Sequence, residues 1–235
     1  MTRLVRETLP DIAARALIAF VQTERLRPGD PLPSEAQLAE RFGVSRPVIR
    51  EALQILHGRG LIDARRHRSA TVSQPSGRQI AAFVEHHLLF DPNGALTLLE
   101  FRRGIEMESA KLAAERADAN TRAHLRRMVS AMAEAVEDTA AYVDADIALH
   151  QAIATASENP LIANFLASAR NATRETIELG LRSRMSDEEL RRVQVAHELL
   201  VDAIAQGDAE ASVLAMARHF DDALRAIRRN LDGSA

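Results

Sequence analysis

The 235-residue chain contains no cysteine and no tryptophan, and aromatic residues make up only 3% of it. The absence of cysteine excludes a disulfide framework and thiolate metal sites. The chain also lacks an apolar run of about 18 residues, the length expected of a membrane-spanning helix. Its amino terminus has no apolar core of a secretion signal, so we expect a cytoplasmic protein that does not contact a membrane.

Charge is distributed unevenly along the chain. Residues 1–75 contain 12 arginines and 8 acidic residues, a formal charge of +4, whereas residues 76–235 contain 18 basic and 25 acidic residues, a formal charge of −7. A polar segment with proline and glycine, 73–77, separates the two parts. We therefore expect two domains, 1–75 and 76–235, with a nucleic-acid surface on the first.

The segment 33–53 predicts two short helices joined by a tight turn. Ser34 and Gln37 have the spacing of a capping box, and Gly43 supplies the left-handed conformation that ends the first helix. Ser45 is the predicted N-cap of the second helix. The apolar residues expected to face inward on that helix are Val48, Ala52, Leu53 and Leu56. This is the architecture of a helix-turn-helix, whose second helix can enter the major groove of DNA.

Two arginines lie on the predicted outward face of the second helix. Arg46 is in its first turn, where backbone N–H groups and the helix dipole also favour phosphate, and Arg50 follows one turn later. An arginine here can hold a phosphate or make a bidentate contact to guanine, and both roles stay open.

Residues 32–35, 38–40 and 44–53 closely resemble the signature of GntR-family bacterial transcription regulators. The resemblance covers roughly residues 10–73, and it implies that Arg46 and Arg50 are the main DNA-contacting side chains. The other residues that we assign as candidate DNA contacts are Ser34, Ser45, His67 and Arg68.

A short β-hairpin, the wing, is expected after the helix pair. Residues 61–65 and 69–73 predict its two strands. Family members usually carry a Gly-x-Gly turn here, whereas this chain has Arg-His-Arg-Ser at 66–69. The change removes the residues best suited to positive φ and adds cations at a tip that can approach the minor groove. We expect the wing to persist with another turn geometry.

From residue 78 onward the sequence predicts helices and no strand. The expected helices are 78–90, 95–117, 119–137, 139–157, 160–182, 186–206 and 208–230. Because alanine is abundant and aromatic residues are few, these helices can pack closely in an antiparallel bundle. The predicted fold class is therefore mainly α: an N-terminal winged helix-turn-helix with a small β-hairpin wing, and a C-terminal all-α antiparallel bundle.

Four residues of the bundle form a candidate metal site. Asp146 and His150 are four residues apart on one predicted helix and so share a face, while His197 and His219 lie on the last two helices. One carboxylate and three imidazoles suit zinc or another divalent transition metal. The alternative is that these histidines are surface or core residues without a ligand.

The Asp-x-x-x-His helix followed by Asn-Pro-Leu at 159–161, together with segment 196–208, is similar to the FCD effector-binding domain of the FadR subfamily of GntR regulators. The resemblance covers roughly residues 80–228. It implies that the four residues hold a divalent ion, zinc before nickel or manganese, at the floor of an effector pocket.

Arg102 is the candidate anion-binding residue of the bundle. Its neighbours one turn away include the apolar residues Leu98, Leu99 and Ile105, and a guanidinium on that side needs an anion unless it reaches past them to water. Arg103 instead lies three residues from both Glu100 and Glu106, which suits a solvated, ion-paired face. Arg102 also matches the pocket arginine of the family, so we expect Arg102 and the metal to clamp the carboxylate of a small organic or sugar acid. The further candidates for polar effector contacts are Asn171 and Arg174.

Together these features predict a ligand-controlled regulator, not an enzyme: a homodimer whose amino-terminal modules occupy the half-sites of a palindromic operator. An acid effector would change the placement of the recognition helices and relieve repression, although activation stays possible. Two alternatives stay open: a metal-dependent enzyme fused to a DNA-binding module, and a constitutive DNA binder whose bundle only dimerises. Against the enzyme, the sequence shows no separate general base, nucleophile or glycine-rich cofactor loop.

Overall fold

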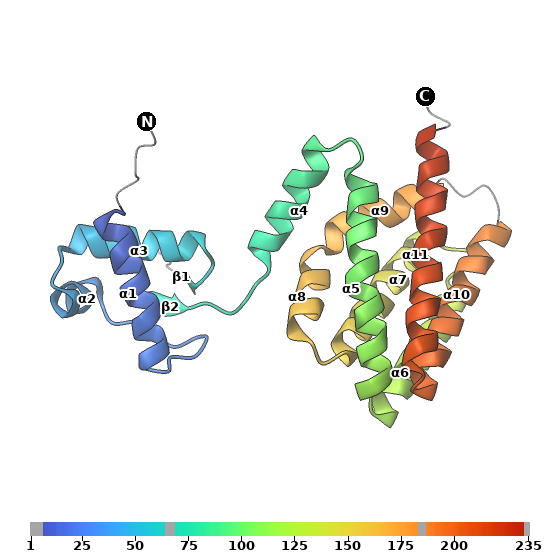
Figure 1. The fold of residues 1–235 in the computed structure, drawn as a ribbon, viewed down its shortest axis with the longest axis horizontal. Helices are drawn as coiled ribbons and strands as arrows, with labels where there is room; N and C mark the ends of the chain where they lie inside the picture. Colours follow the sequence, from blue (N-terminus) through green and yellow to red (C-terminus); the bar gives the residue numbers. More distant parts are fainter. Residues whose placement is uncertain (1–6, 64–68, 183–186, 233–235) are drawn as a thin grey trace. The chain divides into compact units, whose positions relative to one another are not determined.

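The computed structural model describes residues 7–63, 69–182 and 187–232, and its contacts divide the chain into two compact units. The division falls between Gln79 and Ile80, near the start of helix α4 (Arg78–Phe90). Figure 1 shows the elements of each unit. None of the helices in these described ranges is both long and apolar enough to cross a membrane.

The amino-terminal unit is a winged helix-turn-helix, which confirms the predicted fold class for this part of the chain. Its elements are α1 (Leu9–Thr23), α2 (Glu35–Phe42), α3 (Arg46–Gly58), β1 (Ile62–Asp63) and β2 (Thr71–Val72). The two strands pair antiparallel, with Ile62 opposite Val72. The turn between them, 64–68, lies outside the described residues.

Capping and turn residues position α2 and α3, the two helices of the helix-turn-helix. The hydroxyl of Ser34 accepts a hydrogen bond from the Gln37 backbone N–H at 3.3 Å, and the Gln37 side chain accepts one from the Ser34 N–H at 2.9 Å. Gly43 then ends α2 with φ of +66°, where a residue with a Cβ would be strained. Ser45 occupies the N-cap of α3 without a side-chain cap bond, because one of the two usual donor positions is held by Pro47.

The core of this unit is built by the inner stripe of α3 against α1 and α2. Ile49 is 0% exposed, and it completes the helical stripe with Ala52, Leu53 and Leu56. Val48 is only half-buried at the edge of the same core. Val48 therefore packs against the core as predicted, while Ile49, which the prediction left out, is the more deeply buried of the two.

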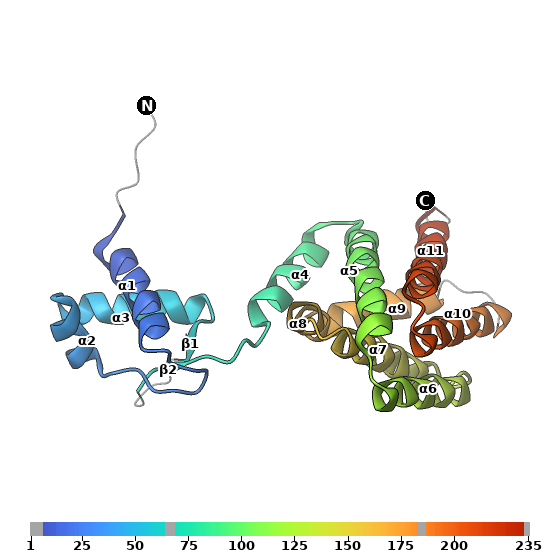
Figure 2. The ribbon, with the colours of Figure 1, turned by 60° about the horizontal axis from the view of Figure 1, so that its bottom comes forward.

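The second unit consists of helices, as predicted. Its elements after α4 are α5 (Gly94–Arg116), α6 (Ala119–Glu134), α7 (Thr139–Ala156), α8 (Pro160–Ser168), α9 (Arg170–Arg182), α10 (Asp187–Gln206) and α11 (Ala209–Asp232). Helix α11 packs along α5 and α10 (Figure 1), and α6 lies against α7 and α10 (Figure 2). The shared core includes Tyr142, Leu149, Leu200 and Phe220.

One predicted helix is interrupted. The range 160–182 forms two helices, α8 and α9, which separate at Ala169, where ψ is +6°. Neither glycine nor proline marks this break in the sequence, and Ala169 is 1% exposed, so it lies in the packed interior of the bundle. Ser186, the first residue of the next expected helix, 186–206, lies outside the described residues.

Candidate metal and effector site and DNA-contacting helix

Three helices bring the four predicted metal ligands together. Asp146 and His150 come from α7, His197 from α10 and His219 from α11. One ligand atom from each residue lies within 4.8 Å of the others. The side chains converge because α7, α10 and α11 all pack against α5, so residues separated by up to 73 positions in the sequence come together.

The donor atoms of this cluster fit a divalent transition-metal ion. The Nε2 atom of His197 lies 3.1 Å from a carboxylate oxygen of Asp146 and 3.4 Å from Nε2 of His150. The Nδ1 atom of His197 is buried and has no hydrogen-bond partner within the described ranges. Imidazole nitrogens and one carboxylate that face a common centre are the ligand types that zinc and its neighbours prefer. The residues present could therefore hold a metal ion.

Glu106 on α5 joins the cluster, and the sequence did not predict this role. Its side chain is 1% exposed, with one carboxylate oxygen paired with Nδ1 of His150. The other oxygen accepts a hydrogen bond from Nε of Arg102 at 2.8 Å. The expectation that Glu106 belongs with Arg103 on a solvated face was wrong, because Arg103 pairs with Asp221 of α11 instead. The signal that could have found it is the four-residue spacing between Arg102 and Glu106.

The two buried carboxylates stay ionised despite their burial. Burial alone would raise the pKa of Asp146, but the hydrogen bond from His197 and the neighbouring imidazoles lower that pKa below its ordinary value. Burial also opposes ionisation of Glu106, whereas Arg102 and His150 lower its pKa overall. For His150, burial is outweighed by Glu106, which raises the pKa of the imidazole. The carboxylates are thus charged and paired with Arg102 and imidazoles, so Asp146 can offer an anionic ligand to a metal ion beside the histidine nitrogens.

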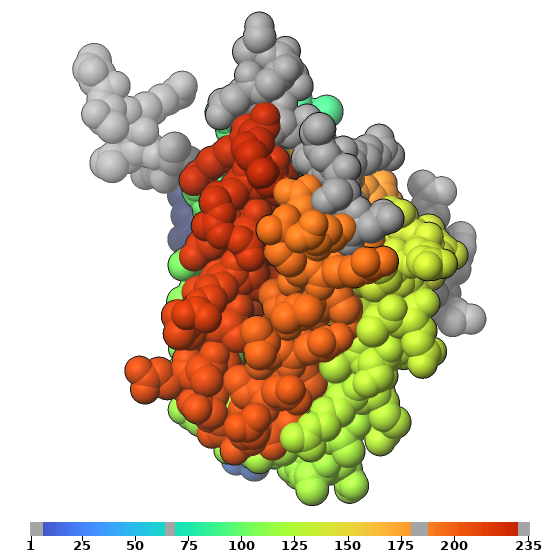
Figure 3. Space-filling model, turned by 90° about the vertical axis from the view of Figure 1, so that its right-hand side faces the viewer, coloured from blue at the N-terminus to red at the C-terminus, as the bar shows by residue number. Residues whose placement is uncertain are grey.

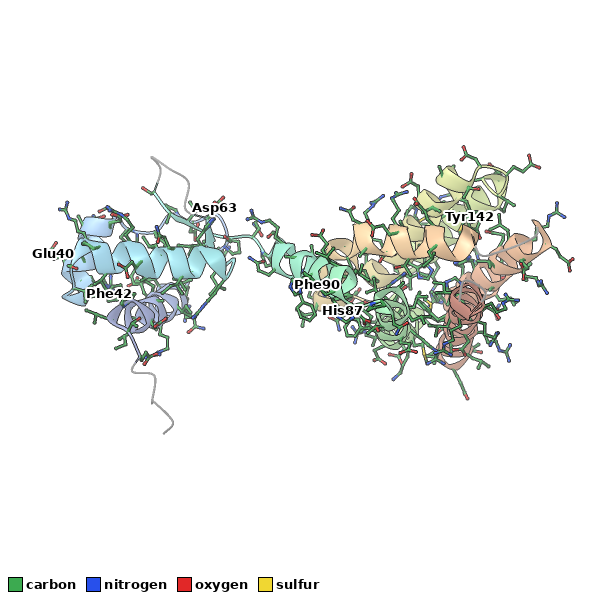
Figure 4. All side chains as sticks on the ribbon, turned by 90° about the horizontal axis from the view of Figure 1, so that it is seen from above. Glu40, Phe42, Asp63, His87, Phe90 and Tyr142 are labelled. Carbon is green, nitrogen blue, oxygen red and sulfur yellow. The ribbon has the colours of Figure 1, made fainter. Side chains whose placement is uncertain are left out.

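Arg102 lies between two small cavities. One cavity, of about 40 Å³, is lined by Arg102, Asp146, His219 and Thr176 among others. Tyr142, labelled in Figure 4, also lines it. The cavity on the other side has a volume of about 130 Å³, and its lining includes Arg102, His150, Gln151, Arg170 and Thr173. Arg102 therefore borders the same internal space as Asp146 and His219.

The two further effector candidates do not line either cavity. Asn171 is exposed on α9, and Arg174 pairs with Asp144 of α7. From the same helix, Thr173 and Thr176 line the cavities instead and are 4% and 3% exposed. Their three-residue spacing places both on one face of α9, a pattern that sequence reasoning missed.

The outward face of α3 carries the two predicted DNA-contacting arginines. Arg46 is exposed and makes no ion pair within the described residues. Arg50 is held by Glu35 of α2, whose oxygens lie 2.7 and 3.2 Å from Nη2 and Nε of the guanidinium. This hydrogen-bonded pair lowers the pKa of Glu35 below its ordinary value. The arginines thus share a helix face but differ in their present partners.

The remaining DNA-contact candidates fall into two groups. Ser34 and Ser45 lie at the N-cap positions of α2 and α3, and Ser45 keeps a hydroxyl that is not used for capping. His67 and Arg68 lie outside the described residues. Their proposed role in the wing therefore stays a prediction.

Comparison with known families and proteins agrees with both units. Residues 11–72 match the model of bacterial regulatory proteins of the gntR family, and residues 97–222 match that of the FCD domain. The chain is 33% identical over 215 residues to the HTH-type transcriptional regulator LutR of Bacillus subtilis, which spans 87% of this chain and 96% of LutR. It is 31% identical over 193 residues to the galactonate operon transcriptional repressor of Escherichia coli, which spans 79% of this chain and 82% of the repressor. The solved structure of Streptococcus agalactiae GntR has the same fold, with a TM-score of 0.72, 22% identity, and coverage of 92% of this chain and 99% of that one.

Proposed function

The chain belongs to the GntR family of bacterial regulatory proteins and carries an FCD domain, and we propose that it represses transcription until a small acid binds beside a divalent metal in its helical unit. Members of the family regulate transcription and are not enzymes. The observation that carries the proposal is the buried convergence of Asp146, His150, His197 and His219 next to Arg102.

We assign DNA reading to residues 1–75, with Arg46 and Arg50 of α3 in the major groove. Arg46 is free to make a bidentate contact to guanine or to hold a phosphate, since the described structure pairs it with no acid. Arg50 must exchange Glu35 for DNA. The hydroxyls of Ser34 and Ser45 sit at helix N-termini, where a phosphate is also favourably placed.

We assign sensing to residues 76–235, with zinc as the metal. Zinc is favoured because three imidazoles and one carboxylate are among its preferred ligands, and nickel or manganese stay alternatives. When bound, the ion would supply a Lewis-acid centre for a carboxylate oxygen of the effector. Glu106 would hold His150 with Nε2 toward the ion through its bond to Nδ1, and Arg102 would take the charge of the acid.

The proposed effector is a small carboxylic or sugar acid. The cavities beside Arg102 hold about 40 and 130 Å³, which favours a compact ligand. The similar E. coli protein represses a galactonate operon, so D-galactonate is a rational first probe. The carboxylate would meet Arg102 and the metal, and Thr173 or Thr176 would meet its hydroxyl groups.

The packing of α4 suggests a route from effector to DNA. Val84 of α4 packs with Leu98 of α5 and Ala172 of α9, and Ala172 immediately precedes the cavity residue Thr173. A ligand that shifts α9 would therefore displace α4, which directly follows the DNA-reading unit in the chain. We propose that this displacement changes the spacing of the two winged helix-turn-helix domains of a dimer, so that both half-sites can no longer be bound at once.

A homodimer is proposed from the surface of the helical unit. Phe83 and Leu89 of α4 are 73% and 76% exposed, and Phe90, labelled in Figure 4, is 70% exposed. Phe101 of α5 and Leu161 of α8 are also exposed. Large apolar side chains left exposed on α4, α5 and α8 are typical of a surface that another chain covers.

The proposal is tested by measuring operator affinity with and without metal and acid. The full-length chain would first select its operator from random-sequence DNA. Fluorescence anisotropy then compares zinc-loaded protein, EDTA-treated protein, and zinc-loaded protein with D-galactonate or other small carboxylic acids. We expect an acid to weaken binding only in the presence of metal. Unchanged affinity under all these conditions would show a constitutive DNA binder, and turnover of the acid would show an enzyme.

A further inference from the structure

The surface of the helical unit carries a cleft of about 480 Å³ between α10 and α11, the two helices that lie side by side in Figure 3. Four arginines line it: Arg192 from α10, and Arg225, Arg228 and Arg229 from α11. The three on α11 follow a spacing of three and one residues, which keeps them on one side of that helix. Two acidic residues, Glu189 and Asp222, complete the charged lining.

The cleft has an excess of cations over anions. Four arginines and two carboxylates line the cleft, and Glu100 of α5 pairs with Arg228 from outside it, in a part of the chain whose formal charge is −7. Glu189 serves two of them, at 3.9 Å from Arg192 and 3.5 Å from Arg229. Asp222 pairs with Arg225 on its own helix. Positive charge is therefore concentrated where the unit as a whole is acidic, and the resulting field attracts small anions.

These ion pairs can be exchanged for an anionic ligand. The arginine side chains are between 55% and 67% exposed, and Arg228, which lines the cleft, also pairs with Glu100 of α5. Ion pairs this exposed contribute little to stability, because water already solvates both charges. An oxyanion that contacts several guanidiniums at once gains bidentate hydrogen bonds that single surface pairs lack.

The cleft is separated from the metal cluster by a single layer of side chains. Val193 lines both the cleft and the inner cavity that contains Asp146 and His219. On the other helix, Ala226 lines the cleft and its neighbour Ile227 lines the inner cavity. Val193 and Ile227 therefore lie between the cleft and the inner cavity, and movement of these two side chains would bring the two spaces together.

We propose that this arginine cleft is an anion-binding site for small molecules with more than one acidic group, and that it forms the entrance to the effector cavity. The role as entrance rests on the proposed function, whereas anion binding in the cleft does not require a metal. The ligand chemistry is the oxyanion, whether carboxylate or phosphate. A second acid group held in the cleft adds to the contact that Arg102 makes inside.

The test titrates the full-length protein, metal-free and zinc-loaded, with tricarballylate, inorganic phosphate and neutral glycerol by isothermal calorimetry. The cleft variant is Arg225→Gln with Arg228→Gln. Its matched control is Arg126→Gln with Arg127→Gln, which removes the same charge from the exposed surface of α6. We expect the cleft variant to weaken binding of tricarballylate or phosphate about tenfold in both metal states, and the control to leave it unchanged. Thermal melting verifies that each variant folds.

Equal binding by the cleft variant and the parent would overturn the cleft proposal. Binding of the anions that appears only with zinc would also overturn it, because the ligand would then sit at the metal. Loss of binding in the cleft variant, in metal-free protein, supports the cleft even if no acid changes operator affinity. In that case the sensor proposal fails and the anion site stands.

Discussion

The two charged clusters of this molecule are built in opposite ways. On α3 both arginines are exposed to solvent, and Arg50 pairs with Glu35 of the preceding helix. In the bundle, Asp146, His150, His197, Arg102 and Glu106 are at most 4% exposed. An exposed cluster costs little to build and can exchange partners, whereas a buried one must be satisfied within itself or by a bound ion. The exposed cluster therefore suits the proposed binding of DNA, and the buried cluster suits the proposed binding of a metal ion and an effector.

The largest effect should come from the buried cluster. Replacing His197 with alanine removes one of four ligands, and we expect zinc affinity to fall by more than about 100-fold. The stabilisation that zinc gives, about 4 kcal/mol at a thousand times its Kd, should disappear with it. Zinc competition titration and thermal melting measure both, with the exposed His124→Ala on α6 as control. Equal zinc binding by the two variants would contradict the metal site.

Substitutions in the exposed cluster on α3 should change DNA affinity and leave zinc affinity unchanged. Arg46→Ala is expected to cost about 1–3 kcal/mol of operator affinity, because a charge-assisted contact to base or phosphate is lost. Arg46→Lys separates the two roles, since lysine keeps the charge without the bidentate geometry. Anisotropy with operator and scrambled DNA measures the outcome. A variant that also lost zinc would break the comparison between the two clusters.

Glu106 tests whether the buried cluster depends on residues behind its ligands. Glu106→Gln should reduce zinc affinity about 10- to 100-fold, since the amide no longer supplies the charge that holds His150. Histidine NMR should show a change in the tautomer or orientation of His150, which a simple loss of stability would not produce. Glu108→Gln, two residues further on and exposed, is the matched control. An unchanged zinc affinity in Glu106→Gln would confine the site to its four ligands.

The smallest effects are expected at the N-cap residues of α2 and α3. Ser34→Ala should lower the free energy of unfolding of the full chain by about 1 kcal/mol, because it removes the capping box of α2. Ser45→Ala should change the free energy of unfolding by only about 0.3 kcal/mol, since the Ser45 side chain makes no cap hydrogen bond. Urea unfolding compares the two. If Ser45→Ala weakens DNA binding without loss of stability, its hydroxyl serves the nucleic acid.

The same contrast explains what the sequence could predict. The cap at Ser34, the turn at Gly43 and the arginines of α3 depend on residues within one or two helical turns, so local spacing was sufficient. The metal ligands were assigned by resemblance to a family, because no local rule links Asp146 to His219. Glu106, Thr173 and the break at Ala169 depend on how distant helices pack, which spacing along the chain does not encode.

The bond between Arg50 and Glu35 has a consequence for the salt dependence of DNA binding. A cation that meets a phosphate normally displaces a condensed counterion from the DNA, and each such event steepens the fall of affinity with salt. Arg50 enters the complex only when Glu35 is released, and that carboxylate then attracts a cation of its own from solution. The gain in mobile ions at this position is therefore smaller than at Arg46. Arg50 should therefore contribute to the orientation of α3 on DNA and to base preference, and should contribute less than Arg46 to the salt dependence of DNA affinity.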